Sequence, residues 1–336
     1  MAYRASAQIQ PQCKDELALA LFVVLQLDML FVILDFAAPK RPTFGNVPYG
    51  VGISHCSVTG KVALTFDDGP YIYTTELLDL LKQNNVRASF FVVGNNAGKG
   101  RINDPSSGYA PIIQRMIADG HQVGSHTWSH QDLNAATREQ RRAQIIHNEI
   151  ALNSILGVIP TYFRPPYTRC AGECLDDLKS WGYHVVNYDI DTRDWQDGGV
   201  KAKSTYQTIL SEHSAASSAW ISLAHDVEDF TVHHFAQFMI DTARRLGYEL
   251  VPVGTCLGDP PENWYRDPIT GQARDVANVA IPLPSKEQPK SSSTSTSSSQ
   301  TTSLRGSTST SSQISSIVTV KTSTSETQTV APKPCS

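Results

Sequence analysis

Short apolar runs alternate with segments of helical spacing between Cys56 and Cys256. Such runs predict buried strands, here at residues 62–66, 88–93, 122–125, 161–164, 184–190, 219–224 and 249–253. Apolar positions three and four apart predict helices, here at residues 76–81, 112–118, 175–181 and 235–246, and a capping-box pattern at 137–140 opens a further, long helix. About seven β/α units result, and this alternation favours parallel strands joined by crossover helices. An α/β barrel and a doubly wound sheet both fit, and either fold places functional residues at the C-terminal ends of its strands.

The two ends of the 336-residue chain have a different character. Between residues 291 and 330, 27 of 40 residues are Ser or Thr, so this stretch cannot bury enough apolar surface to fold. We expect a folded domain at 51–258, a linker at 259–290, and a disordered tail at 291–336 that is O-glycosylated or a plain spacer.

The N-terminal segment, 1–50, resembles a signal peptide or signal anchor, because residues 17–38 are mostly apolar and follow Lys14. Asp28 and Asp35 argue against a membrane-spanning helix. A wrongly assigned start of the reading frame is the alternative interpretation.

Charge and cysteine content indicate the partners and the compartment. The formal net charge is −4 and no basic block occurs, which argues against nucleic acid as a partner. An even number of cysteines beside a mucin-like tail favours a secreted or cell-wall protein with disulfides. We expect a monomer whose tail associates with the cell wall. Six cysteines allow 15 pairings, and composition does not choose among them: Cys13, Cys56, Cys170, Cys174, Cys256 and Cys335.

Candidate metal ligands follow the first and third predicted strands. Asp67 and Asp68 end the first strand, where neighbouring side chains point apart and can serve different roles, although Asp-Asp-Gly-Pro also forms ordinary turns. His126 and His130 follow the third strand, and on a helical turn both rings would face the same way. With Asp68 they make a set of two imidazoles and one carboxylate, which is typical of catalytic zinc and also of non-haem iron oxygenases.

Three more motifs follow later strands. In Arg164-Pro-Pro-Tyr167 the prolines would hold the arginine side chain and the tyrosine amide rigidly, unless the segment is only a stiff surface loop. Asp191-Thr-Arg-Asp-Trp195 and Leu223-Ala-His225 follow the next two strands. A single histidine after an apolar strand is usually a core residue, but five motifs in order at successive strand ends together indicate an active site.

In these five motifs the chain resembles the polysaccharide deacetylases, which are the NodB-homology carbohydrate esterases of family four, and most closely the fungal chitin deacetylases. The resemblance extends over about residues 56–256. It implies a distorted, incompletely closed (β/α) barrel of about seven strands. It also implies two disulfides, Cys56–Cys256 and Cys170–Cys174, and leaves Cys13 and Cys335 without a role.

The resemblance further implies how the first motifs act. Asp68, His126 and His130 would hold a zinc ion, or in some members cobalt. Asp67 would be the general base, and Arg164 would pair with it.

The later motifs would complete the catalytic machinery. The Tyr167 amide would help to form the oxyanion site. His225 would be the general acid, and Asp194 would orient and charge it. Trp195 and Leu223 would line the acetyl pocket.

The reaction implied is metal-dependent N-deacetylation of chitin or chitooligosaccharides, which releases acetate and leaves glucosamine units in the polymer. The same chemistry on acetylxylan or peptidoglycan is one alternative. A catalytically silent cell-wall binding protein is another, suggested by the Ser/Thr-rich tail. The complete set of base, acid and metal ligands argues against a silent binder.

Overall fold

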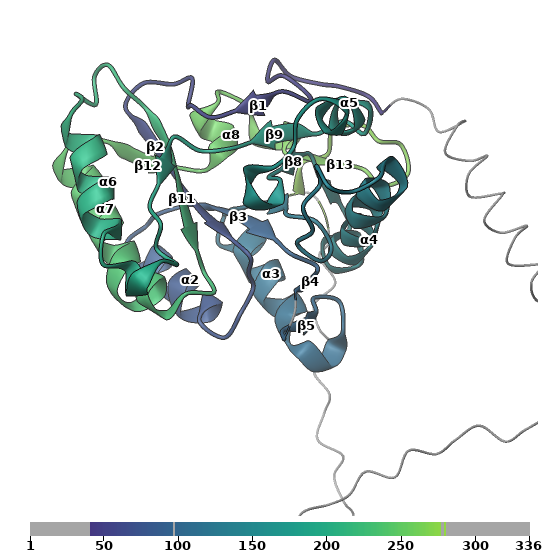
Figure 1. The fold of residues 1–336 in the computed structure, drawn as a ribbon, viewed down its shortest axis with the longest axis horizontal. Helices are drawn as coiled ribbons and strands as arrows, with labels where there is room; N and C mark the ends of the chain where they lie inside the picture. The colour runs from purple at the N-terminus through teal and green to yellow at the C-terminus, as the bar shows by residue number, and fades with distance from the viewer. Residues whose placement is uncertain (1–40, 97, 277–278, 280–336) are drawn as a thin grey trace, which may run out of the picture. The chain divides into compact units, whose positions relative to one another are not determined.

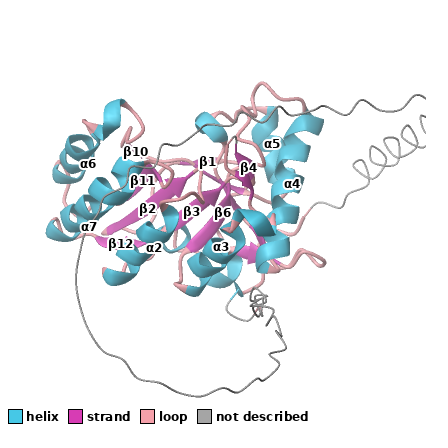
Figure 2. Ribbon diagram, turned by 90° about the horizontal axis from the view of Figure 1, so that it is seen from below, coloured by secondary structure: helices cyan, strands magenta, loops and turns pink. Residues whose placement is uncertain are grey.

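A parallel β-sheet forms the centre of the structure, and helices lie around its outside (Figures 1 and 2). The computed structural model describes residues 41–96, 98–276 and 279, which all belong to one unit, Pro39–Ser285. The strands of the main sheet are β1 (Gly52–Ile53), β2 (Lys61–Asp67), β3 (Ser89–Val92), β6 (Gln122–Ser125), β8 (Tyr162–Phe163), β9 (His184–Val186), β10 (Ile190–Asp191), β11 (Trp220–His225) and β12 (Glu249–Val251). The α-helices described are α2 (Thr74–Gln83), α3 (Tyr109–Ala118), α4 (Arg138–Leu156), α5 (Glu173–Ser180), α6 (Ala202–Ser211), α7 (Ala236–Arg245) and α8 (Val253–Cys256).

The sheet curls into an incompletely closed barrel. Its order is β1-β9-β8-β6-β3-β2-β11-β10, with β12 paired to β2, and its neighbouring strands are parallel. Strands β9 and β10 lie towards opposite ends of this order, although only residues 187–189 separate them. The Asn187 N–H donates to the Ile53 carbonyl of β1 (2.7 Å), and the Asp189 N–H donates to the Ile221 carbonyl of β11 (3.1 Å). The chain therefore crosses the opening between the two sheet edges at this point, which confirms the predicted open barrel.

Residues 184–190 and 202–211 differ from the sequence-based prediction. A single strand at 184–190 is wrong, because its two halves pair with different edges of the curled sheet. Helix α6 was not predicted, since only Ala202, Tyr206 and Leu210 of its residues are buried. Their spacing of four is a narrow apolar stripe, and it is the signal that could have revealed this helix.

Strand β2 carries the first catalytic motif and is buried on both faces. Val62, Ala63, Leu64 and Phe66 have no exposed surface, as expected for a parallel strand that faces the barrel interior on one side and the surrounding helices on the other. The ring of Phe66 stacks on Phe90 of β3, with centroids 5.4 Å apart. This packing fixes the end of β2, from which the acidic side chains of the site project.

Helix α4 begins at the predicted capping box. The Gln140 N–H donates to Thr137 Oγ1 (3.3 Å), and the Thr137 N–H donates to Gln140 Oε1 (2.9 Å). The helix ends at Gly157, whose φ of +70° is the left-handed conformation that glycine adopts without strain.

The folded unit extends beyond the expected boundaries of 51 and 258. On the N-terminal side, Arg41 donates two hydrogen bonds to the carboxylate of Glu149. On the C-terminal side, β13 (Tyr265–Arg266) pairs antiparallel with β7 (Ile159–Pro160), and both residues of β13 are buried. Residues 259–276, expected as linker, are therefore packed structure.

Both expected disulfides, Cys56–Cys256 and Cys170–Cys174, are formed. The first ties the segment before β2 to the end of α8. The expected signal or anchor within 1–40, the Ser/Thr-rich tail, Cys13 and Cys335 lie outside the described residues. Within the described ranges, no helix combines the length and the apolar character needed to cross a bilayer.

Candidate metal centre and active site

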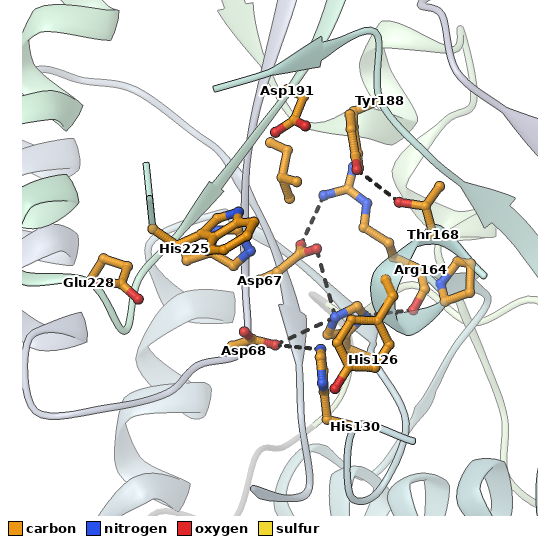
Figure 3. Close-up of a pocket in the computed structure, with 14 residues that line it drawn as sticks. Asp67, Asp68, His126, His130, Arg164, Thr168, Tyr188, Asp191, His225 and Glu228 are labelled. Carbon is orange, nitrogen blue, oxygen red and sulfur yellow. Dashed lines mark hydrogen bonds and ion pairs between the residues drawn. The ribbon is translucent and has the colours of Figure 1, made fainter. Parts of the chain in front are cut away.

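A cavity of about 440 Å³ lies at the C-terminal ends of β2, β10 and β11, and receives the loops after β6 and β8 (Figure 3). All the predicted site residues line it except Asp194, which is buried behind His225. The lining residues are Asp67, Asp68, His126, His130, Arg164, Pro165, Tyr167, Thr168, Tyr188, Asp191, Trp195, Leu223, His225 and Glu228.

Asp68, His126 and His130 form a set of three convergent ligand atoms. Asp68 Oδ1 lies 3.2 Å from Nε2 of His130 and 3.5 Å from Nε2 of His126, and one ligand atom from each residue lies within 4.8 Å of the others. The backbone of Asp68 is left-handed (φ 75°), so its carboxylate turns into the same cavity as that of Asp67. The nearby histidines lower the pKa of Asp68 against the opposing effect of burial.

This set fits a divalent metal ion. Asp68 Oδ1 is buried and accepts no well-directed hydrogen bond within the described structure, so it is an anionic atom in need of a cation. His126 Nδ1 lies 2.6 Å from the carbonyl oxygen of Arg164, to which it must donate. This contact fixes the tautomer and leaves Nε2 with a free lone pair, and metal-binding histidines typically donate their other ring N–H to such a carbonyl oxygen.

The two histidines do not lie on a helical turn, and that prediction is wrong. Residues 126–130 form a loop in which Thr127 and His130 have positive φ values of 70° and 55°. The His130 N–H donates to Thr127 Oγ1 (3.0 Å), and the Ser129 N–H donates to Gln144 Oε1 of α4 (2.8 Å). Hydrogen bonds to the loop, rather than helical periodicity, bring the rings together. Left-handed residues of this kind cost about 1–3 kcal/mol each and cluster at functional sites.

Arg164 is a buried partner of Asp67 and not a surface side chain. It is 1% exposed, and its Nη1 donates to Asp67 Oδ1 (2.9 Å) and to Thr65 Oγ1 (2.5 Å). Its Nε and Nη2 donate to the carbonyl oxygens of Val186 and Asn187. The guanidinium is thus held at the C-terminal end of β9, where the chain leaves this strand towards β10. It binds one oxygen of Asp67 and leaves the other, Oδ2, 3.8 Å from His126 Nε2.

His225 and Asp194 form a second ordered pair. His225 Nδ1 lies 2.8 Å from Asp194 Oδ1, while Asp194 Oδ2 accepts from the His225 N–H (2.7 Å) and from Thr231 Oγ1 (2.5 Å). Burial alone would lower the pKa of His225, but the bond to Asp194 and the charges of Asp194, Asp67 and Asp68 raise it to about 9. This pKa favours the imidazolium form of His225 at neutral pH. Because Nδ1 binds Asp194, Nε2 is the ring nitrogen available to a ligand in the cavity.

The aromatic residues Tyr167 and Trp195 stand at the cavity mouth. Their side chains are 62% and 54% exposed, whereas Leu223 is buried in the wall. The ring of Tyr167 packs edge-on against His130, with centroids 4.6 Å apart. The main chain of Tyr167 is left-handed (φ 57°) in a short turn after the two prolines.

Three cavity residues lie outside the five motifs and were not predicted: Thr168, Tyr188 and Glu228. The Tyr188 hydroxyl shares a hydrogen bond with Thr168 Oγ1 (2.8 Å), and its ring lies beside the guanidinium of Arg164. Glu228 follows the His225 motif by three residues. Tyr188 fell inside a predicted strand, and Glu228 belongs to none of the five motifs, so only proximity to the other motifs in the fold could have identified them.

The chain is similar to known proteins of one family. A family model described as polysaccharide deacetylase matches residues 55–186. The chitin deacetylase of Colletotrichum lindemuthianum is 44% identical over 226 residues, which cover 66% of this chain and 89% of that protein. The chitin deacetylase of Pestalotiopsis sp is 44% identical over 230 residues, 68% of this chain and 74% of that one. The solved structure of the Colletotrichum lindemuthianum enzyme superposes with a TM-score of 0.63 at 43% identity, over 66% of this chain and 97% of that chain.

Proposed function

Since the chain belongs to the polysaccharide deacetylase family, we propose that it removes N-acetyl groups from chitin or chitooligosaccharides in a metal-dependent hydrolysis. The observation that carries this proposal is the meeting of three residue groups in one cavity. These are the Asp68–His126–His130 triad, the Asp67–Arg164 pair and the His225–Asp194 pair. Acetate would be released, and glucosamine units would remain in the polymer.

The triad supplies the metal site in this proposal. Asp68, His126 and His130 would hold zinc, or cobalt, and leave coordination positions open, as catalytic zinc sites do. When bound, such an ion lowers the pKa of water and polarises a carbonyl group.

Asp67 acts as the general base. Arg164 binds Oδ1 and fixes the carboxylate, so that Oδ2 faces the metal ligands and is the atom available to accept a proton from the attacking water. The contacts of Arg164 with β2 and with the end of β9 hold this geometry before substrate binds.

His225 acts as the general acid. An amine is a poor leaving group, so the sugar nitrogen must be protonated as its bond to the acetyl carbon breaks. His225 starts as the imidazolium because Asp194 raises its pKa, and it can donate the proton from Nε2. The Tyr167 amide would stabilise the oxyanion, a contribution of about 2.7–4 kcal/mol for one donor. Trp195 and Leu223 would enclose the acetyl methyl group.

Acetate release tests the proposal. Chitin oligomers, acetylxylan and peptidoglycan are each incubated with the protein, with and without a chelator, and after zinc or cobalt is added back. We expect acetate from chitin oligomers, its loss with chelator and its recovery with metal. Release only from acetylxylan or only from peptidoglycan would assign the same chemistry to that substrate, and polymer binding without any release would indicate a silent binder.

Replacement of Asp194 is expected to move the pH dependence of the reaction. Asp194→Asn removes the charge that raises the pKa of His225, so that burial lowers this pKa. Because activity needs the imidazolium, it is lost as pH rises through the His225 pKa, and the variant should lose activity about 1–3 pH units earlier than wild type. The measurement is a kcat–pH profile on a chitin oligomer. Asp132→Asn, which changes a half-buried carboxylate outside the cavity, is the control. An unshifted alkaline limb in Asp194→Asn would contradict the role of the His225–Asp194 pair.

We also propose that the protein acts outside the cell, in secreted form or at the cell wall. Two disulfides support an oxidising compartment. The monomeric state, the zinc preference and cell-wall association through the Ser/Thr-rich tail stay predictions.

A further inference from the structure

Glu228 is the cavity residue to which the proposed reaction gives no role. It lies in the loop after β11, half-buried, and lines the same cavity as His225. In Figure 3, His225 lies between Glu228 on one side and Asp67 with the metal ligands on the other. Its backbone is held by hydrogen bonds, since its N–H donates to the His225 carbonyl (3.2 Å) and its own carbonyl accepts from Val232 (3.2 Å).

The carboxylate of Glu228 differs from the other acidic groups of the cavity because no described residue pairs with it. Asp67 binds Arg164, Asp68 faces two histidines, and Asp191 lies 3.4 Å from the guanidinium of Arg193. Glu228 is in the negative part of the site: burial and the charges of Asp194 and Asp68 raise its pKa, and only His225 opposes them.

A half-buried carboxylate has lost part of its hydration, and a ligand with hydrogen-bond donors or positive charge would compensate for that loss. The substrate of the proposed reaction offers hydroxyl groups, acetamide groups and, wherever deacetylation has already occurred, a protonated amine. Of these groups only the ammonium is a cation, and it neutralises the carboxylate as well as donating hydrogen bonds.

We propose that Glu228 is a specificity residue that binds the ammonium group of a glucosamine unit next to the sugar being deacetylated. This inference rests on the proposed function. In the proposed reaction His225 protonates the reacting nitrogen, and Glu228 lies across His225 from the general base Asp67, so its carboxylate would meet the neighbouring sugar. The enzyme would therefore favour partially deacetylated chains and would extend deacetylation from units already converted.

The test compares kcat/KM for a fully acetylated tetramer and for tetramers with one glucosamine unit at each defined position. It is run with metal-loaded full-length protein, below the pKa of the sugar amine. We expect one glucosamine position to raise kcat/KM about fivefold at low salt, the size of one partly exposed ion pair, and this preference to shrink at high salt. In Glu228→Gln the ratio between the two substrates should fall to about one, and in Glu228→Lys the preference should reverse.

Asp229→Asn is the matched control, because it removes a negative charge from the residue next to Glu228. The Asp229 side chain is exposed and does not line the cavity. This variant should keep the wild-type ratio. A wild-type enzyme without any preference at low salt overturns the inference, whether or not the variants fold, and so does a Glu228→Gln enzyme that keeps the preference. Absence of acetate from every tetramer would instead refute the proposed function, which keeps the two failures distinct.

Discussion

Replacement of Asp67 by asparagine is expected to abolish nearly all turnover while the metal stays bound. The amide oxygen can still accept the hydrogen bond from Arg164 Nη1 and has the same size, so the local packing is kept. The amide nitrogen that replaces Oδ2 cannot accept a proton, and loss of a general base lowers kcat by about 10²–10⁴-fold. The measurement is kcat on a chitin oligomer, together with the metal content of the purified protein.

Asp132→Asn is the matched control for this experiment. Asp132 also pairs with an arginine, Arg169 (2.8 Å), but this pair lies at the surface and outside the cavity. The control should keep both its metal and its kcat. An Asp67→Asn enzyme with kcat close to that of wild type would show that another group accepts the proton.

Replacement of His126 by alanine is expected to remove both metal and activity. His126 is 3% exposed, and its ring is held by the hydrogen bond to the Arg164 carbonyl. Its Nε2 is one of the three convergent ligand atoms, so alanine at this position removes a ligand. Loss of a residue that only hydrogen-bonds a metal ligand typically costs about 10–100-fold in metal affinity or activity, so loss of a ligand itself should exceed about 100-fold. Elemental analysis and acetate release, each with and without added zinc, measure the two effects.

The fold must be checked in parallel, because His126→Ala leaves a space in a buried part of the loop. Circular dichroism and thermal unfolding of the variant serve this purpose, and His130→Ala offers a second, less buried ligand position. His147→Ala, an exposed histidine of α4 outside the cavity, should bind metal and react like wild type. A folded His126→Ala protein that still releases acetate would remove the metal triad from the mechanism.

The amino-acid sequence was sufficient to predict most strands and helices of the barrel and their order. The apolar runs at β2, β3 and β11 are local signals, so their composition and flanking residues reveal them without tertiary information. The capping box of α4 is likewise a local signal, and its two hydrogen bonds form as predicted. Because parallel strands place their C-terminal ends on one side, the order of the motifs was enough to predict a shared site.

The arrangement within that site depended on contacts between distant segments. Residues 126–130 were predicted as a helical turn, yet hydrogen bonds to α4 and left-handed backbone conformations shape them as a loop. Residues 184–190 were predicted as one strand, yet closure of the curled sheet divides them between two edges. Neither outcome can be read from periodicity, which reports only on a residue's near neighbours in sequence.

The sequence by itself therefore determined that this chain alternates strands and helices and carries five groups of chemically active residues at strand ends. Only the tertiary structure decided which oxygen of Asp67 is free, which nitrogen of His126 faces Asp68, and that the unpaired Glu228 shares the cavity. The physical reason is that strand formation is driven by local burial patterns. Hydrogen-bond partners and unpaired charges, in contrast, are set by the register and curvature of the closed sheet.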